Sequence, residues 1–72
     1  MSALEVRNQI RELRTSNEGM TQEKLAKLCD VTRQTIIALE AGKYSPSLEL
    51  AFKLANALGR TLDDVFQYAE EK

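Results

Sequence analysis

Arg33 and Gln34 are neighbouring residues whose side chains can each make two parallel hydrogen bonds to one planar partner. An arginine used in this way matches the O6 and N7 edge of guanine, and a glutamine matches the N6 and N7 edge of adenine. Either contact would discriminate between bases by roughly 1–3 kcal/mol. Such recognition requires a rigid element that presents both side chains together.

The apolar residues on either side of this pair predict that element. They recur at the three- and four-residue spacing of two short helices, and they are Leu25, Ala26, Cys29, Ile36 and Leu39. The expected helices cover residues 22–29 and 33–41. Asp30 can adopt the left-handed conformation that turns the chain between them, and Val31 would fill the corner. Residues 21–41 therefore read as a helix-turn-helix, which places its second helix in a major groove.

Three more helices are expected around this motif. The first would start at Ser2, with Ser2 and Glu5 as a capping box, and would end near residues 15–17. Its buried stripe would be Val6, Ile10 and Leu13.

The fourth helix is expected over residues 48–58, with Ser47 as its cap. Thr61 and Asp64 would open a fifth helix. Gly19, Gly42 and Gly59 each fall at an expected helix end. The fold class is accordingly all-α, a compact five-helix bundle formed by residues 1–72 as a single domain.

Composition excludes several classes of function. The chain of 72 residues has no histidine and one cysteine, so we expect no metal site, no cofactor and no enzymatic activity. Cys29 would be either a small core residue or, less simply, a redox sensor. Without an apolar run long enough to cross a membrane or a signal peptide, the expected location is the cytoplasm. No small-molecule ligand is evident.

The charge distribution weighs against a uniformly basic surface. The net charge is −1, below the basic excess that is typical of nucleic-acid-binding domains. Residues 1–17 nevertheless carry three arginines against two glutamates, whereas residues 49–72 carry five acidic residues against three basic ones. A locally positive face is therefore compatible with the overall balance.

Taken together, the motifs resemble the phage-repressor and Cro-like helix-turn-helix regulators of the xenobiotic-response-element type. The resemblance covers residues 4–67 and rests on IRELR, MTQEKLA, VTRQTIIALEAGKYSPSLELAFKLANALG and TLDDVF. It implies the lambda-repressor-like fold and double-stranded DNA as the partner. Ile37 departs from the Ser or Asn common at its position, and it would either contact a thymine methyl or mark a face that meets protein.

The motif and the resemblance together assign roles to individual residues. With Ile36 and Leu39 facing inward, the base-reading residues would be Arg33, Gln34, Thr35, Ile37 and Ala38. The resemblance implies DNA phosphate contacts at Gln22, Thr32, Lys43, Tyr44, Ser45 and Arg14. It also implies a structural salt bridge between Arg14 and Glu40.

One recognition helix reads few bases, so we expect a two-fold dimer on a palindromic operator. The expected dimer contact is the fifth helix with the polar tail, residues 67–72, using Val65, Phe66 and Tyr68. Val65 and Phe66 could equally well close the core of the monomer.

The leading hypothesis is a homodimeric repressor that occludes a promoter. One alternative is an antitoxin, which would use the same fold and also bind a toxin. The other is a protein-interaction module that has lost DNA binding; the acidic balance and Ile37 favour it, whereas Arg33, Gln34, Gln22 and Lys43 oppose it.

Overall fold

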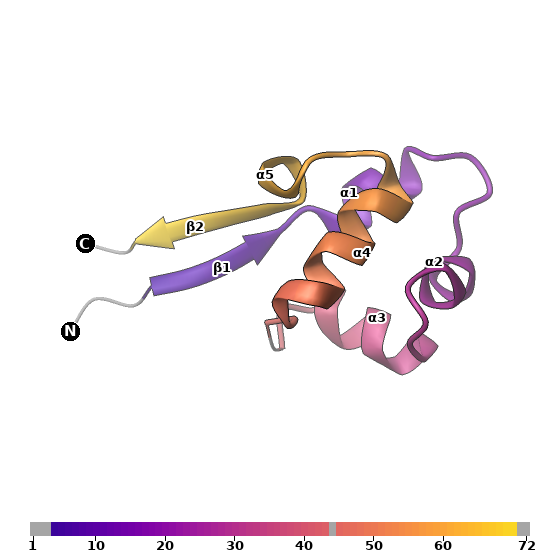
Figure 1. The fold of residues 1–72 in the computed structure, drawn as a ribbon, viewed down its shortest axis with the longest axis horizontal. Helices are drawn as coiled ribbons and strands as arrows, with labels where there is room; N and C mark the ends of the chain where they lie inside the picture. Colours follow the sequence, from indigo (N-terminus) through magenta and orange to yellow (C-terminus); the bar gives the residue numbers. More distant parts are fainter. Residues whose placement is uncertain (1–3, 44, 71–72) are drawn as a thin grey trace.

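The computed structural model describes residues 4–43 and 45–70, which form five helices and one pair of strands (Figure 1). In chain order they are β1 (Leu4–Asn8), α1 (Ile10–Thr15), α2 (Gln22–Leu28), α3 (Arg33–Glu40), α4 (Leu48–Leu58), α5 (Leu62–Val65) and β2 (Phe66–Glu70). The helices form the body of the molecule. The two strands form an antiparallel ribbon that projects away from it (Figure 1). The five expected helices are confirmed.

The predicted helix-turn-helix is present as α2, a tight turn and α3. Asp30 has a φ of 60°, so it takes the left-handed conformation expected of it. Val31 is half-buried in the corner, and its amide donates to the carbonyl oxygen of Ala26 at 2.9 Å. The core inside this corner is formed by fully or almost fully buried side chains from five helices and the turn: Ile10, Leu25, Ala26, Cys29, Ile36, Leu39, Leu54, Ala55, Leu58 and Val65.

Short polar side chains begin four of the helices, and two of them, Ser47 and Thr61, are the caps predicted from the sequence. The hydroxyls of Thr21, Thr32 and Ser47 each accept a hydrogen bond from the amide three residues on. Thr61 and Asp64 form the expected capping box. These caps satisfy backbone amides that a helix leaves without partners, so local chemistry sets where each helix starts.

The expected start of the first helix is wrong. Residues 4–8 form β1 instead, and α1 begins only at Ile10. The physical reason lies in Asn8, whose Oδ1 accepts a hydrogen bond from the amide of Ile10 at 3.1 Å and whose Nδ2 donates to the carbonyl oxygen of Leu39 at 2.9 Å. Asn8 is therefore the last residue of β1 and accepts from the amide of the first residue of α1, while the N-cap residue of α1, Gln9, makes no side-chain cap. Val6 is consequently 45% exposed rather than part of a buried stripe, and Ser2 lies outside the described residues.

The tail also differs from the sequence expectation. The fifth helix has only four residues, and Phe66–Glu70 pairs with β1 as β2. On α4, Leu48 and Phe52 are 68% and 50% exposed, so the broad apolar face of this helix is only partly used by the core.

Replacing Asp30 tests the turn of the motif. Asp30→Val should lower the free energy of unfolding by roughly 1–2 kcal/mol relative to Asp30→Gly, because a β-branched residue is strained at positive φ and glycine is not. Urea denaturation of the two variants measures the difference. Equal stabilities would show that the turn does not require this conformation.

Candidate nucleic-acid interface

Helix α3 has a buried face and an exposed face. Ile36 and Leu39 are completely buried, as expected, and hold α3 against the core. Arg33 and Gln34, in its first turn, are exposed, while Thr35, Ile37 and Ala38 are half-buried. Within the described part of the chain, the side chains of Arg33 and Gln34 have no hydrogen-bond or ion-pair partner in the protein. Their donors are therefore available to an external partner.

An ion pair beneath this face joins α1 to α3. Arg14 Nε donates to Glu40 Oε2 at 2.7 Å and Arg14 Nη2 donates to Glu40 Oε1 at 3.3 Å, so the contact is bidentate. Only 13% of the arginine side chain and 6% of the glutamate side chain are exposed. This is the salt bridge that the resemblance implied, and it lies largely shielded from solvent.

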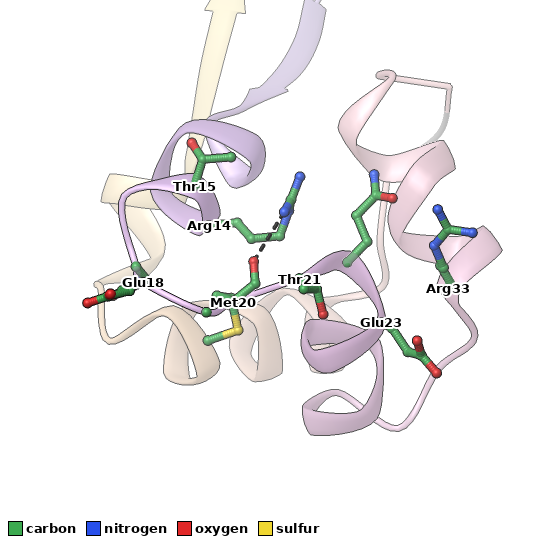
Figure 2. A pocket seen from close by; sticks show the side chains of 10 residues that line it. Arg14, Thr15, Glu18, Met20, Thr21, Glu23 and Arg33 are labelled. Atoms are coloured by element: carbon green, nitrogen blue, oxygen red, sulfur yellow. Dashed lines mark hydrogen bonds between the residues drawn. The ribbon is translucent and has the colours of Figure 1, made fainter.

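Two further hydrogen bonds extend the ion pair to α2. Arg14 Nη1 donates to the carbonyl oxygen of Met20 at 3.1 Å, and Gln22 Nε2 donates to Glu40 Oε1 at 3.1 Å. Figure 2 shows Arg14 reaching from α1 to the Met20 carbonyl and Arg33 projecting from the start of α3, and both arginines line one open depression of 590 Å³. Arg14 therefore connects α1 both to the segment before α2 and to the end of α3.

The other residues that the resemblance implied as phosphate contacts lie at the two ends of α3. Thr32 is exposed and caps α3, and its hydroxyl is also 3.1 Å from that of Thr35. Lys43 and Ser45 are exposed beyond the end of α3, and Tyr44 lies outside the described residues. Gly42, at a φ of 71°, reverses the chain so that the Lys43 amide returns to the Ala38 carbonyl oxygen at 3.0 Å.

Arg11 is a candidate that the sequence analysis did not assign. It lines an open depression of 390 Å³ together with Arg14, Gln22, Ile37, Glu40 and Ala41. Arg11 is exposed, whereas Arg14 is occupied by Glu40. The spacing of three residues between Arg11 and Arg14 places them on one face of a helix, and this signal could have identified it.

The three residues expected at a dimer contact lie in different environments. Val65 is completely buried and belongs to the core, so its assignment to a dimer contact is wrong, because no part of its side chain is accessible to a second molecule. Phe66 is half-buried against the core. Tyr68, in β2, is 67% exposed. Of the two alternatives, closure of the monomer core is therefore correct for Val65.

The described residues provide no arrangement for metal chemistry, since no three of their His, Cys, Asp or Glu side chains are grouped to hold a metal ion. Cys29 is buried, and desolvation raises the pKa of its thiol, an effect that the positive charge of Lys53 partly opposes. A buried thiol with a raised pKa is a poor nucleophile. No helix in residues 4–43 and 45–70 has the length and apolar character needed to span a bilayer.

The fold and this exposed helix define a helix-turn-helix protein. A profile of the family described as Helix-turn-helix matches residues 10–65, from the first residue of α1 to the last residue of α5. The chain belongs to this family, and within it to the Cro-like, xenobiotic-response-element type of DNA-binding transcriptional regulator. The family is generally non-enzymatic.

Several proteins are similar over nearly the whole chain. An uncharacterized HTH-type transcriptional regulator of Methanothermobacter thermautotrophicus is 55% identical over 67 residues, covering 92% of this chain and 96% of that protein. The uncharacterized HTH-type transcriptional regulator YgzD of Bacillus subtilis is 46% identical over 66 residues, covering 92% and 98%. The control protein C.BamHI of Bacillus amyloliquefaciens is 37% identical over 59 residues, covering 82% and 73%.

Removing Arg14 tests the ion pair. Arg14→Ala should lower the free energy of unfolding by about 3 kcal/mol, because it leaves the carboxylate of Glu40 shielded from water without its main partner. Chemical denaturation measures the loss. Lys53→Ala is the matched control. It breaks the exposed ion pair in which Lys53 Nζ lies 3.5 Å from Glu49 Oε2, and it should lower the free energy of unfolding by less than about 1 kcal/mol. Equal losses in the two variants would contradict a structural role for the Arg14 pair.

Proposed function

We propose that this chain is a homodimeric transcriptional repressor that reads a palindromic operator by inserting α3 into the major groove. The single observation that carries the proposal is the exposure of Arg33 and Gln34 in the first turn of a helix whose opposite face is completely buried. Residues at the N-terminal end of a recognition helix are the ones that reach base edges in this class of domain. Repression would follow from occlusion of a promoter.

The chemistry of the exposed face supports direct base recognition. Arg33 can donate two hydrogen bonds to guanine, and Gln34 can both donate to and accept from adenine. Ile37 and Ala38, which are half-buried, offer apolar contact to a thymine methyl group. Thr35 lies at the border between the exposed and the buried face of α3, where its hydroxyl already interacts with that of Thr32.

The charges around the face support contacts with the DNA backbone. Lys43 is exposed beyond the end of α3, and the exposed Arg11 lines a depression together with Ile37, while Arg14 is neutralised by Glu40. We propose phosphate contacts by Gln22, Thr32, Lys43, Ser45 and Arg11, and a minor contribution from Arg14. Because the chain has a net charge of −1 and therefore no excess of positive charge, its affinity for non-specific DNA should be low.

Selection from random duplexes tests the proposal. The purified chain should enrich a palindrome whose half-sites lie about 10–10.5 base pairs apart, or a multiple of that spacing. Its affinity for the selected site should fall as salt rises, with a slope that counts the neutralised phosphates. If a folded, dimeric sample enriches no sequence, sequence-specific DNA binding is rejected. The alternative of a protein-interaction module that has lost DNA binding is then favoured.

Two substitutions distinguish base contacts from phosphate contacts. Arg33→Ala should weaken binding by roughly 1–3 kcal/mol for each half-site and relax preference at one base position of each half-site. Lys43→Ala should weaken binding to all sequences alike and reduce the salt slope by about two, one for each copy in the dimer. Fluorescence anisotropy on cognate and scrambled duplexes measures both.

Arg60→Ala is the matched control for these two variants. Arg60 is an exposed arginine that follows α4, a full helix length away from the loop that carries Lys43. Its removal should leave binding unchanged. If Arg33→Ala behaves like Arg60→Ala, α3 is not the reading element.

A further inference from the structure

Asn8 lies two residues before the part of the chain that the family profile matches, which begins at residue 10. It is the last residue of β1 and is half-buried. Its side chain contacts both the start of α1 and the end of α3. A polar side chain in this place can affect how α3 is presented to DNA.

Both polar atoms of the Asn8 side chain have a partner. Nδ2 donates to the Leu39 carbonyl oxygen at 2.9 Å, and Oδ1 accepts from the Ile10 amide at 3.1 Å. Turning the amide group over would place its oxygen against the Leu39 carbonyl and its NH₂ group against the Ile10 amide, so both contacts would become repulsive. The planar amide group is therefore held in one orientation and links α1 to α3 at a fixed distance.

The bond to Leu39 meets α3 at its C-terminal motif. Gly42 has a φ of 71°, and its amide donates to the Leu39 carbonyl oxygen at 3.0 Å. The Lys43 amide donates to the Ala38 carbonyl oxygen, also at 3.0 Å. These two bonds are those of a Schellman motif. Because a carbonyl oxygen has two lone pairs, Asn8 binds the last turn of α3 at a group that this motif already holds in place.

The Asn8 bond and the Arg14–Glu40 ion pair act on neighbouring residues of α3 in different directions. Carbonyl groups of an α-helix point along its axis towards the C-terminus, so the bond from Asn8 to Leu39 restrains α3 along its axis. The ion pair with Arg14 instead reaches the side chain of Glu40, which extends from the side of the helix. The two contacts together resist a tilt of α3 that either one alone would permit.

A restraint at the end of α3 affects its start, where Arg33 and Gln34 lie. The helix has 8 residues, which gives it a length of about 12 Å. A tilt of about 5° around its C-terminal end would displace its first residue by about 1 Å. Binding constellations need placement within about 0.5 Å to work well. A small tilt is therefore enough to weaken bidentate base contacts while the helix stays folded.

The ribbon in turn holds the backbone of Asn8 in place. Asn8 pairs with Phe66 at the end of the antiparallel register. The amide of the next residue, Gln9, donates to the carbonyl oxygen of Val65 at 2.8 Å, and Val65 is completely buried. The position of Asn8 is therefore set by the core, and its side chain transmits that position to α3.

We propose that Asn8 is a positioning residue for base recognition: its bond to the Leu39 carbonyl oxygen, together with the ion pair of Arg14, sets the angle at which α3 enters the major groove. The inference rests on base recognition by α3, proposed above, and adds a residue that acts through α3 and not through its own contact with DNA. Loss of the bond reduces discrimination between sequences more than it reduces affinity for DNA in general.

Asn8→Ala tests the proposal by removing both side-chain bonds. Its dissociation constant for the selected duplex should rise by about tenfold for each half-site, because base contacts require alignment. Its dissociation constant for a scrambled duplex should change by less than about twofold, because phosphate contacts carry no sequence information. Fluorescence anisotropy on the two duplexes measures the discrimination. Unchanged discrimination, or equal weakening on both duplexes, would overturn the proposal.

Asn8→Asp separates the two bonds. At neutral pH the new carboxylate still accepts from the Ile10 amide, but it faces the Leu39 carbonyl oxygen with a second acceptor, so discrimination should fall as in Asn8→Ala. A protonated carboxyl group has an O–H donor, so discrimination should recover as the pH falls through the pKa of the new group, relative to the parent chain at the same pH. A loss that does not recover on protonation would contradict the role of the donor.

Two variants control for lost stability and for a changed surface. Thr61→Ala removes the side-chain cap of α5, which is not part of the link between α1 and α3. Asn56→Ala makes the same replacement as Asn8→Ala at an exposed position of α4. Both should keep the discrimination of the parent chain, and circular dichroism verifies that each variant is folded. If Asn8→Ala does not fold, Asn8→Asp provides the test because it keeps the bond to α1.

The free protein separates failure of this inference from failure of the proposed function. Residual dipolar couplings of backbone amides give the angle between α3 and α4 without DNA, and this angle should change in Asn8→Ala but not in Thr61→Ala. If it does so while the parent chain enriches no duplex, the restraint on α3 stands and the proposed function fails. If the parent chain enriches a palindrome and Asn8→Ala keeps both the angle and the discrimination, the inference is overturned and the proposed function stands.

Discussion

The contact between Arg14 and Glu40 constrains the orientation of the whole exposed face. One arginine binds the end of α3 through Glu40 and the residue before the α2 cap through the Met20 carbonyl, while Gln22 adds a third helix to the same carboxylate. A shielded pair of this kind contributes modest net stability, but it strongly penalises any arrangement that separates its partners. Its main effect is therefore geometrical: it holds α3 at one angle to α1.

The apolar core and this polar network stabilise the position of α3 in different ways. Burial of Ile36 and Leu39 supplies the free energy that holds α3 to the body, yet apolar contacts tolerate small rotations. The hydrogen bonds to Glu40 do not tolerate such rotations, because their strength depends on angle and distance. Packing therefore fixes the position of α3 and the hydrogen bonds fix its orientation, so Arg33 and Gln34 extend from a rigid helix, which base recognition requires.

The ribbon has a different relation to the fold. It joins the two ends of the described chain through backbone hydrogen bonds and is anchored to the body by Asn8 and the Gln9 amide. Because the helix-turn-helix lies between its strands in the sequence, pairing of β1 with β2 closes the domain around α1 to α5.

The sequence by itself determined the helices over residues 22–65, because Thr21, Thr32, Ser47, Thr61 and Asp30 act through backbone groups a few residues away. It also indicated which face of α3 is exposed. Only the tertiary structure decided the state of residues 4–8 and 66–70, since LEVRN and FQYAE fit a helix or a strand equally at this length and each strand needs the other as its partner. For the same reason the placement of Val65 in the core, of Val6 at the surface and of Arg11 beside the recognition helix follows from packing between segments far apart in the chain.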